Sequence, residues 1–294
     1  MDTGNYYLFQ LIYILWSALK NTSDYYKSIF GNDNIDHMNI FKIDFKNIIL
    51  TFSQLFIPKL PISPPDCLNN YVKLVLFGDK SRYIPSKKYN LNPEMCILFI
   101  NGISGFLENT LNTVSILENK LQRPVNLIYN STNCLVIDLL ESAIGKQTSM
   151  ITEPSLVALQ TICQKILNPD IKKVVIISYS QGTIIIAKVL QNLKNLGITK
   201  KEYLEKLEIY AFANCATNMN YVNHKLPYIE SLANNNDIVC KLGCNHSKEI
   251  SRLISIDGNI FVDKSGNGHF FIRHYLNNFS NKFPKSNLLN YFKK

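Results

Sequence analysis

A short strand that runs directly into a helix constrains the fold of this chain more than any other feature. The residues 174–177 are all Val or Ile, the composition of a strand covered on both faces in a parallel sheet. After Gly182 the apolar residues change to a spacing of three and four, which predicts a helix ending near Gly197. Ser180 therefore lies in a tight turn between a strand and a helix.

The turn has a small residue two positions on either side of Ser180, in the sequence Ser178-Tyr-Ser-Gln-Gly182. This sequence resembles the nucleophile elbow of the α/β-hydrolase superfamily, on its lipase and esterase side, where the pattern is G-x-S-x-G. Here serine replaces the first glycine. The resemblance implies that Ser180 is a nucleophile and that the backbone N–H of Gln181 faces the site. An ordinary turn between a strand and a helix is the alternative.

Predicted strands and helices alternate along most of the chain. Strands are expected at 71–77, 95–100, 125–129, 207–213, 228–233 and 254–262, the last as a short hairpin about 257–258, and helices at 109–121, 135–144 and 154–167. This alternation predicts an α/β fold with a mostly parallel central sheet flanked by helices. With the resemblance, it implies an α/β-hydrolase fold in residues 71–294, preceded by an N-terminal extension in residues 1–70.

The loop after the predicted strand 95–100 contains Asn101-Gly102-Ile103. It resembles the His-Gly pair found in the oxyanion loop of many α/β-hydrolases, with Asn in place of His. By that resemblance, the N–H groups of Ile103 and Gln181 are the two donors of an oxyanion hole. An ordinary turn between a strand and a helix would also accommodate this glycine.

An acid and a base follow Ser180 in the chain. Asp237 comes just after the second strand beyond Ser180, where the superfamily has its triad acid, although an Asx turn would look the same. His269 follows Gly268 in a loop after the last strand, from which a base can reach the serine, and His274 is the alternative base. We therefore predict a Ser180–Asp237–His269 triad in a serine hydrolase that cleaves carboxylic esters and needs no cofactor or metal.

Residues 6–19 are apolar nearly all round and contain the only tryptophan. Fourteen residues are too few to span a bilayer, and the preceding residues include an acid and no base, unlike a signal peptide. The segment is expected to pack on the domain, to form a lid, or to contact a membrane. A membrane contact would favour lipid or acyl substrates.

Charge and cysteine content set the expected surroundings. The formal net charge is +9, and the chain after Asp263 has basic residues and no acid, so this tail either contacts anionic membranes or is a solvated surface. No nucleic-acid motif accompanies it. Seven scattered cysteines favour reduced thiols and a cytoplasmic location, with or without membrane association. Cys240, Cys244 and His246 lack a fourth zinc ligand.

Three other functions remain open. A thioesterase or acyltransferase would use the same three residues. A catalytically degenerate fold acting as a binding or membrane-docking module is suggested by Ser178 and Asn101, which depart from the superfamily pattern. A peptidase would be expected to have a large cap or propeller, which the sequence does not suggest.

Overall fold

The computed structural model describes residues 65, 67–69, 72–73, 78–89, 94–103, 107–131, 152–221, 226–245 and 254–292. The apolar segment 6–19, the predicted helix 135–144 and all but four residues of the predicted extension 1–70 lie outside these ranges. Within the described part, none of the helices has the length and apolar content of a membrane span.

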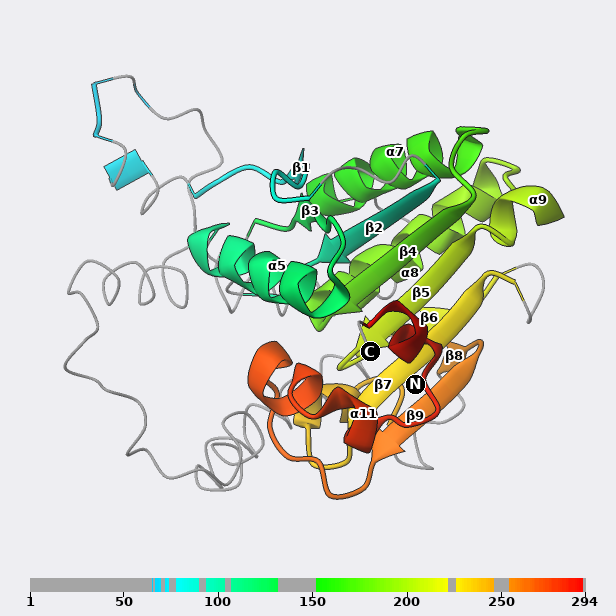
Figure 1. The fold of residues 1–294 in the computed structure, drawn as a ribbon. Coiled ribbons are helices and arrows are strands. Elements are labelled where there is room, and N and C mark those ends of the chain that lie inside the picture. Colours follow the sequence, from blue (N-terminus) through cyan, green and yellow to red (C-terminus); the bar gives the residue numbers. More distant parts are fainter. Residues whose placement is uncertain are drawn as a thin grey trace, which may run out of the picture.

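A seven-stranded sheet in the order β1-β3-β2-β4-β5-β7-β9 forms the centre of the fold (Figure 1). Its strands are β1 (Arg82–Ile84), β2 (Met95–Ile100), β3 (Asn126–Tyr129), β4 (Lys173–Tyr179), β5 (Leu207–Phe212), β7 (Tyr228–Asn234) and β9 (Asn259–Asp263). The first strand pairs antiparallel with β3, and all the other neighbouring pairs are parallel. The predicted fold class, a mostly parallel sheet flanked by helices, is confirmed.

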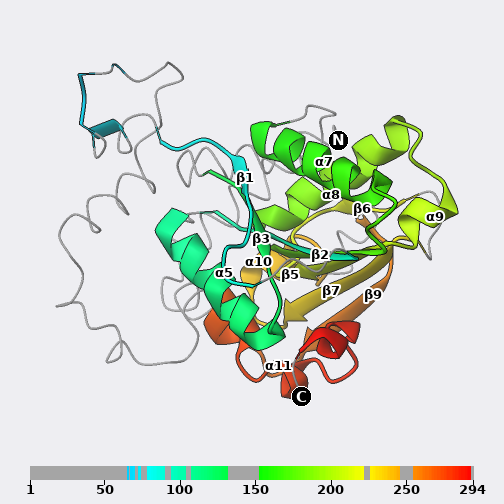
Figure 2. The same cartoon turned by 45° about the horizontal axis from the view of Figure 1, so that its top comes forward.

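Helices cover both faces of the sheet (Figure 2). One face packs against α7 (Glu153–Leu167), α8 (Gln181–Asn195) and the short α9 (Lys201–Leu204). The other packs against α5 (Leu107–Leu121) and a C-terminal segment, residues 271–292, which contains the π-helix η4 (Phe271–Leu276), α11 (Phe279–Lys282) and the 3₁₀-helix η5 (Asn287–Tyr291). A one-turn helix, α10 (Ile238–Lys241), follows β7.

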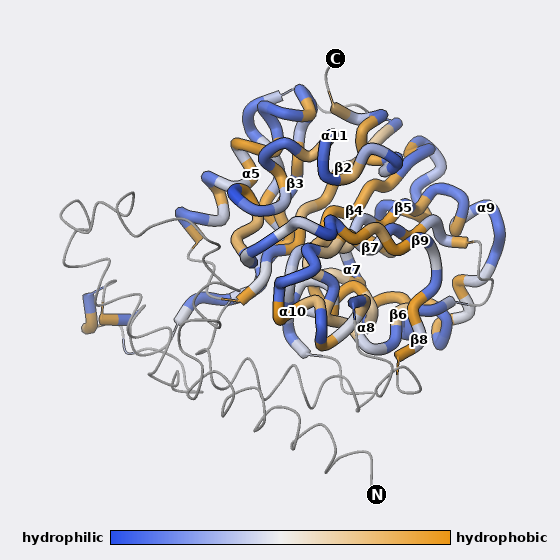
Figure 3. The backbone as a smooth tube through the Cα atoms, turned by 90° about the horizontal axis from the view of Figure 1, so that it is seen from below, coloured by the Kyte–Doolittle hydropathy of each residue, from blue (hydrophilic) through white to orange (hydrophobic). Residues whose placement is uncertain are grey.

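Strand β4 is buried on both faces, which explains its sequence. Val174 and Ile176 pack into the apolar cluster beneath α7 and α8, whereas Val175 and Ile177 pack into the cluster beneath α5 and the C-terminal segment. Each of these side chains contributes about 1.5–3 kcal/mol by its burial. Figure 3 shows hydrophobic residues along the central strands and polar residues over the outlying α9. The continuous apolar run was therefore a reliable signal of a central strand.

The predicted strand 71–77 is wrong where the structure describes it. Val72 and Lys73 are helical. The side chain of Asn69 accepts the N–H of Val72 at 2.8 Å, and its carbonyl oxygen accepts the N–H of Lys73 at 3.0 Å. This capping by a carboxamide favours a helical turn over the strand that the apolar residues suggested.

The expected hairpin about residues 257–258 is also wrong. β8 (Ser255–Ile256) pairs with β6 (Asn218–Met219) in a separate two-stranded sheet, while β9 joins the main sheet beside β7. Gly258 has φ +88°, and a Cβ there would lie 2.2 Å from the carbonyl oxygen of Ile229. Only glycine allows this approach to β7, which directs the chain from one sheet to the other.

The direction of strand addition reverses between β2 and β4. The chain places β3 on one side of β2, and then β5, β7 and β9 on the far side of β4. Ligands of open α/β sheets bind at such a switch point, at the carboxyl ends of the strands. Asn101 follows β2 and Ser180 follows β4, so both predicted site segments lie at this point.

Candidate active site

Ser180 has a backbone conformation that non-glycine residues rarely adopt, with φ 53° and ψ −122°. Its carbonyl oxygen accepts the N–H of Thr183 at 2.8 Å and the hydroxyl of Thr183 at 2.7 Å, and its N–H donates to the carbonyl oxygen of Phe212 at 3.0 Å. These bonds hold the residue in its strained conformation. The side chain is thus presented at a sharp corner between β4 and α8.

The small residues around Ser180 have separate structural reasons. A Cβ on Gly182 would lie 2.5 Å from the carbonyl oxygen of Ile100, because α8 starts close against β2. Ser178 is fully buried, and its Oγ has no hydrogen-bond partner in the described part of the chain. An unsatisfied buried hydroxyl destabilises a fold by about 1–3 kcal/mol. The turn nevertheless forms with serine in place of the first glycine.

His269 joins Ser180 to Asp237. Its Nε2 lies 3.0 Å from Ser180 Oγ, and its Nδ1 lies 2.8 Å from Asp237 Oδ2. Asp237 is fully buried, and its Oδ1 accepts the N–H of Val239 at 2.9 Å, so it also caps α10 as an Asx residue would. With the proton on Nδ1, the imidazole donates to the carboxylate and accepts from the serine hydroxyl. Such a chain can move a proton from the hydroxyl to the imidazole.

The loop that carries His269 is held by Asn234 and Tyr179. Asn234 Nδ2 donates to the carbonyl oxygens of Gly268 at 3.0 Å and His274 at 3.3 Å. The Tyr179 hydroxyl donates to the carbonyl oxygen of His269 at 2.5 Å, and the two rings lie 5.1 Å apart. Gly268 has φ +78°, and a Cβ there would lie 2.5 Å from the ring of His274, so the residue before His269 has to be glycine.

His274, the alternative base, supports this loop instead. It is buried in η4, its Nδ1 accepts the N–H of Phe270 at 2.9 Å, and its ring stacks on Phe270 at 5.6 Å. The π-helix begins at Phe271, after His269, so the two histidines are not on the same helix. The structure places His269 against the serine.

Three buried carboxamides join the ends of β2, β3 and β4. Asn101 Oδ1 accepts the N–H of Asn130 at 2.8 Å, and Asn101 Nδ2 donates to the carbonyl oxygens of Asn130 at 2.9 Å and Gly102 at 3.0 Å. Asn130 Nδ2 donates to Gln181 Oε1 at 2.6 Å. These bonds tie the loop after β2 to the first residue of α8. The sequence analysis missed Asn130, although a polar residue directly after a buried strand was the available signal.

The loop after β2 also contacts the serine. A Cβ on Gly102 would lie 2.8 Å from the Cβ of Ser180 and 3.1 Å from the carbonyl oxygen of Tyr179. Gly102, the residue before Ile103, therefore lies beside Ser180. The N–H of Gln181 lies next to the serine along the chain, at the start of α8.

Tyr275 is a second residue that the sequence analysis missed. Its hydroxyl donates to Asp237 Oδ2 at 2.6 Å and lies 3.1 Å from the thiol of Cys240. Burial raises the pKa of the Tyr275 phenol and of the Cys240 thiol well above their usual values, so both groups are neutral near pH 7. The position of Tyr275, six residues after His269, gave no sequence signal for its contact with Asp237.

The described ranges contain no group of three or more His, Cys, Asp and Glu side chains arranged to hold a metal ion. Cys240 and Cys244 are both buried free thiols, whereas His246 lies outside the described residues. Of the other cysteines in the described ranges, Cys96 and Cys215 are buried and take no part in a disulfide.

No family model matches this chain, and no curated protein sequence matches it. Among solved structures, it is similar to a cutinase from Trichoderma reesei in complex with a C11Y4 phosphonate inhibitor, at 17% identity and a TM-score of 0.35, over 58% of this chain and 73% of the cutinase. It is also similar to a lipase-esterase related protein from Clostridium acetobutylicum, at 11% identity and a TM-score of 0.38, over 66% of this chain and 94% of that protein. Both TM-scores are below 0.5, so the site is interpreted from its own geometry.

Proposed function

We propose that this protein is a serine hydrolase that cleaves carboxylic esters through an acyl-enzyme. The observation that carries the proposal is the continuous hydrogen-bonded chain from Asp237 through His269 to a strained Ser180. Free serine is a poor nucleophile, so His269 takes the hydroxyl proton as Ser180 Oγ attacks the carbonyl carbon. Asp237 keeps the imidazole in the required tautomer and stabilises its cation.

His269 then donates its proton to the leaving alcohol, and the acyl group stays on Ser180. Water, activated by the same imidazole, attacks the acyl-enzyme and releases the carboxylic acid. The N–H groups of Gln181 and Ile103 are proposed to hold the tetrahedral oxyanion. This role is supported by the carboxamide bonds from Asn101 and Asn130 that fix the two segments in place.

The proposed substrates are small esters or lipids with an apolar acyl chain. Support comes from the sequence, in which residues 6–19 form an apolar segment suited to a lid or a membrane contact, with a basic C-terminal tail. Both the peripheral membrane contact and a cytoplasmic location belong to this proposal. A thioesterase or acyltransferase would use the same triad with a different acyl donor or acceptor.

The test is hydrolysis of p-nitrophenyl esters with acyl chains of increasing length, together with a matched acyl thioester. We expect turnover that is abolished by Ser180→Ala and by His269→Gln. Ser178→Ala is the matched control, because that hydroxyl is buried two residues from Ser180 and has no hydrogen-bond partner in the described part of the chain, so this variant should keep its turnover. The chain length with the highest kcat/KM defines the acyl preference, and a faster thioester reaction would define a thioesterase.

No turnover of any ester or thioester by the folded wild-type protein would contradict the proposal. It would favour a degenerate fold that acts as a binding or membrane-docking module. The two departures that suggested this alternative, Ser178 and Asn101, are both accommodated in the structure: the turn at Ser180 keeps its strained φ, and the Asn101 carboxamide makes three hydrogen bonds.

A further inference from the structure

We infer that Tyr275 is a positioning residue, whose hydroxyl shares Asp237 Oδ2 with His269 and so limits the proton affinity of the imidazole. This inference deepens the proposed function and rests on it for its catalytic meaning. The contacts that carry it are the 2.6 Å bond from the Tyr275 hydroxyl to Asp237 Oδ2 and the 2.8 Å bond between the same oxygen and His269 Nδ1.

The direction of the Tyr275 bond follows from the groups around the phenol oxygen. An ionised carboxylate can only accept, so the single phenol hydrogen points to Asp237. The phenol oxygen in turn accepts the N–H of Asn234 at 3.2 Å and faces the thiol of Cys240 at 3.1 Å. Tyr275 is fully buried. The phenol can donate to the carboxylate only when its hydrogen points to Asp237 Oδ2.

Asp237 consequently has three donors: Val239 N–H on Oδ1, and the imidazole and the phenol on Oδ2. A hydrogen bond to a charged group is stronger than one between neutral groups. The phenol therefore holds part of the carboxylate charge that would otherwise act on the imidazole alone. Without it, the carboxylate would attract the proton on His269 more strongly.

The other titratable groups that face this carboxylate are neutral. The charge of Asp237 acts on Tyr179 from β4 and on Cys240 from α10, and Cys244 hydrogen-bonds to Cys240. Burial raises the pKa of Tyr179, as it does for Cys240, well above its usual value.

One short segment supplies both donors to Asp237 Oδ2, and Tyr275 is the one that lies in the π-helix η4. His269 precedes η4, and Tyr275 is its fifth residue. The N–H of Asn277 donates to the carbonyl oxygen of Ile272 at 2.9 Å, the wider i to i−5 spacing of a π-helix. Such turns are rare and are frequently found at functional sites.

The experiment measures the titration of the His269 imidazole by NMR, with His269→Gln to assign its signals. In Tyr275→Phe we expect the midpoint of this titration to rise by about half a pH unit to one pH unit, a three- to tenfold gain in proton affinity. The midpoint of the acid limb in the pH profile of kcat/KM should move up by the same number of pH units. We expect kcat to fall and KM to stay unchanged. An unchanged midpoint in folded Tyr275→Phe would overturn the inference.

Tyr210→Phe is the matched control, because the Tyr210 hydroxyl is also buried and donates to a carboxylate, Glu208 Oε2, at 2.8 Å. It should leave the His269 titration unchanged. If Tyr275→Phe does not fold, 3-fluorotyrosine placed at position 275 makes a stronger donor and should lower the midpoint; a rise or no change would contradict the inference. The titration can be repeated in Ser180→Ala, which has no activity to lose, so its result is independent of whether the ester assay supports the proposed function.

Discussion

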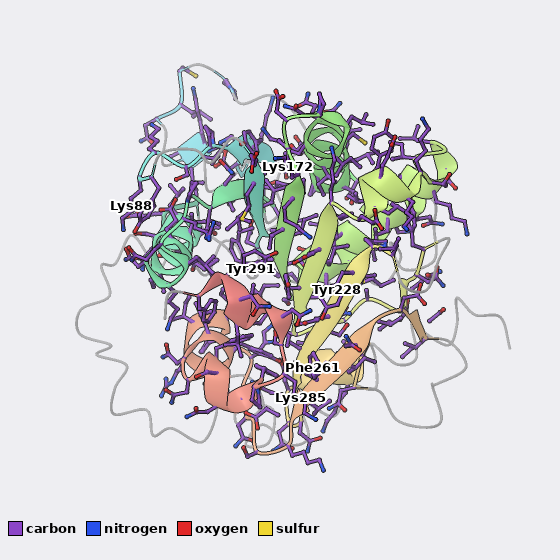
Figure 4. All side chains as sticks on the ribbon, turned by 45° about the vertical axis from the view of Figure 1, so that its right-hand side comes forward. Lys88, Lys172, Tyr228, Phe261, Lys285 and Tyr291 are labelled. Atoms are coloured by element: carbon purple, nitrogen blue, oxygen red, sulfur yellow. The ribbon has the colours of Figure 1, made fainter. Side chains whose placement is uncertain are left out.

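Carboxylates in two regions of the molecule accept hydrogen bonds from tyrosine hydroxyls: Asp237 in one, and Glu208 and Glu230 in the other. Asp237 lies at the carboxyl end of β7, in the candidate site. Glu208 and Glu230 lie toward the amino ends of β5 and β7, beneath the C-terminal segment. Figure 4 labels Tyr228 and Tyr291 in this second group, where the C-terminal segment meets the sheet.

The second group is closed. Glu230 accepts the hydroxyl of Tyr228 at 2.5 Å and the N–H of Asn287 at 2.7 Å, and the hydroxyl of Ser286 also donates to it. Glu208 accepts hydrogen bonds from the side chains of Lys173 at 2.7 Å, Tyr210 at 2.8 Å and Tyr291 at 2.7 Å. These hydrogen bonds hold the C-terminal segment against the sheet. Neither Glu208 nor Glu230 has an imidazole among these donors, in contrast to Asp237.

Asp237 differs in one partner, His269, which reaches a serine with strained backbone. A buried carboxylate with a tyrosine donor is thus a structural device in one place and part of a candidate catalytic site in the other. The imidazole and the strain at Ser180 mark the difference. The following variants test whether Asp237 serves catalysis while Glu208 and Glu230 serve stability.

The largest expected effect is on turnover in Asp237→Asn. The carboxamide favours the wrong imidazole tautomer, so kcat for a p-nitrophenyl ester should fall on the order of 10⁴-fold. Glu230→Gln makes the same chemical change in the second group and should leave kcat within about twofold. Equal losses in the two variants would mean that the groups do not differ in function.

The next effect is on stability in Glu230→Ala. This variant removes the acceptor of Tyr228, Ser286 and Asn287 and leaves buried donors without a partner, so the free energy of unfolding should fall by about 3–5 kcal/mol. Asp237→Asn should lose less, because the imidazole and the phenol can each change from donor to acceptor. Urea denaturation of the two variants measures this, and the reverse order would contradict the comparison.

A smaller effect on turnover is expected in Asn101→Ala. Loss of its three hydrogen bonds frees the loop that carries Gly102 and Ile103, so kcat/KM should fall about ten- to a hundredfold. Asn126→Ala is the matched control, since Asn126 is a buried carboxamide that bridges β3 to the carbonyl oxygen of Ile97 at 3.1 Å. If both variants lose the same activity, Asn101 has only a structural role.

The smallest effect is on the pH dependence of stability. Burial alone would raise the pKa of Glu208, but hydrogen bonds from Lys173, Tyr291 and Tyr210 bring it below its usual value of 4.5. A lowered carboxyl pKa stabilises the fold above the unfolded value, and that contribution is lost as the pH falls through the folded value. Glu208→Gln should therefore lose less stability than the wild type between about pH 5 and pH 3. If urea denaturation gives the same pH dependence of stability for Glu208→Gln and the wild type, Glu208 makes no such contribution.

Most of the central fold could be predicted from the sequence. The strand 95–100 and the strand and helix around Ser180 were predictable because a strand buried on both faces needs a continuous apolar run, and a helix that packs on a sheet has apolar residues at a spacing of three and four. One error came from a local cap, and the other came from a close backbone approach between distant segments. The Asn69 cap replaced a predicted strand, and the contact of Gly258 with β7 separated two strands that looked like a hairpin.

The site was predictable as far as chain order and loop position could define it. Ser180, Asp237 and His269 each follow a recognisable strand, and the structure brings them together. Asn130 could be noticed only as a polar residue directly after a buried strand. Its contact with Gln181, 51 residues away, and the contact of Tyr275 with Asp237, 38 residues away, have no local signal.

Covalent labelling by a fluorophosphonate probe tests the central claim most directly. We predict one label per folded chain, located by mass spectrometry on the peptide that contains Ser180, lost in Ser180→Ala and His269→Gln and retained in Ser178→Ala. A folded wild-type protein that stays unlabelled, or a label that persists in Ser180→Ala, would contradict the claim that Ser180, His269 and Asp237 form a catalytic unit.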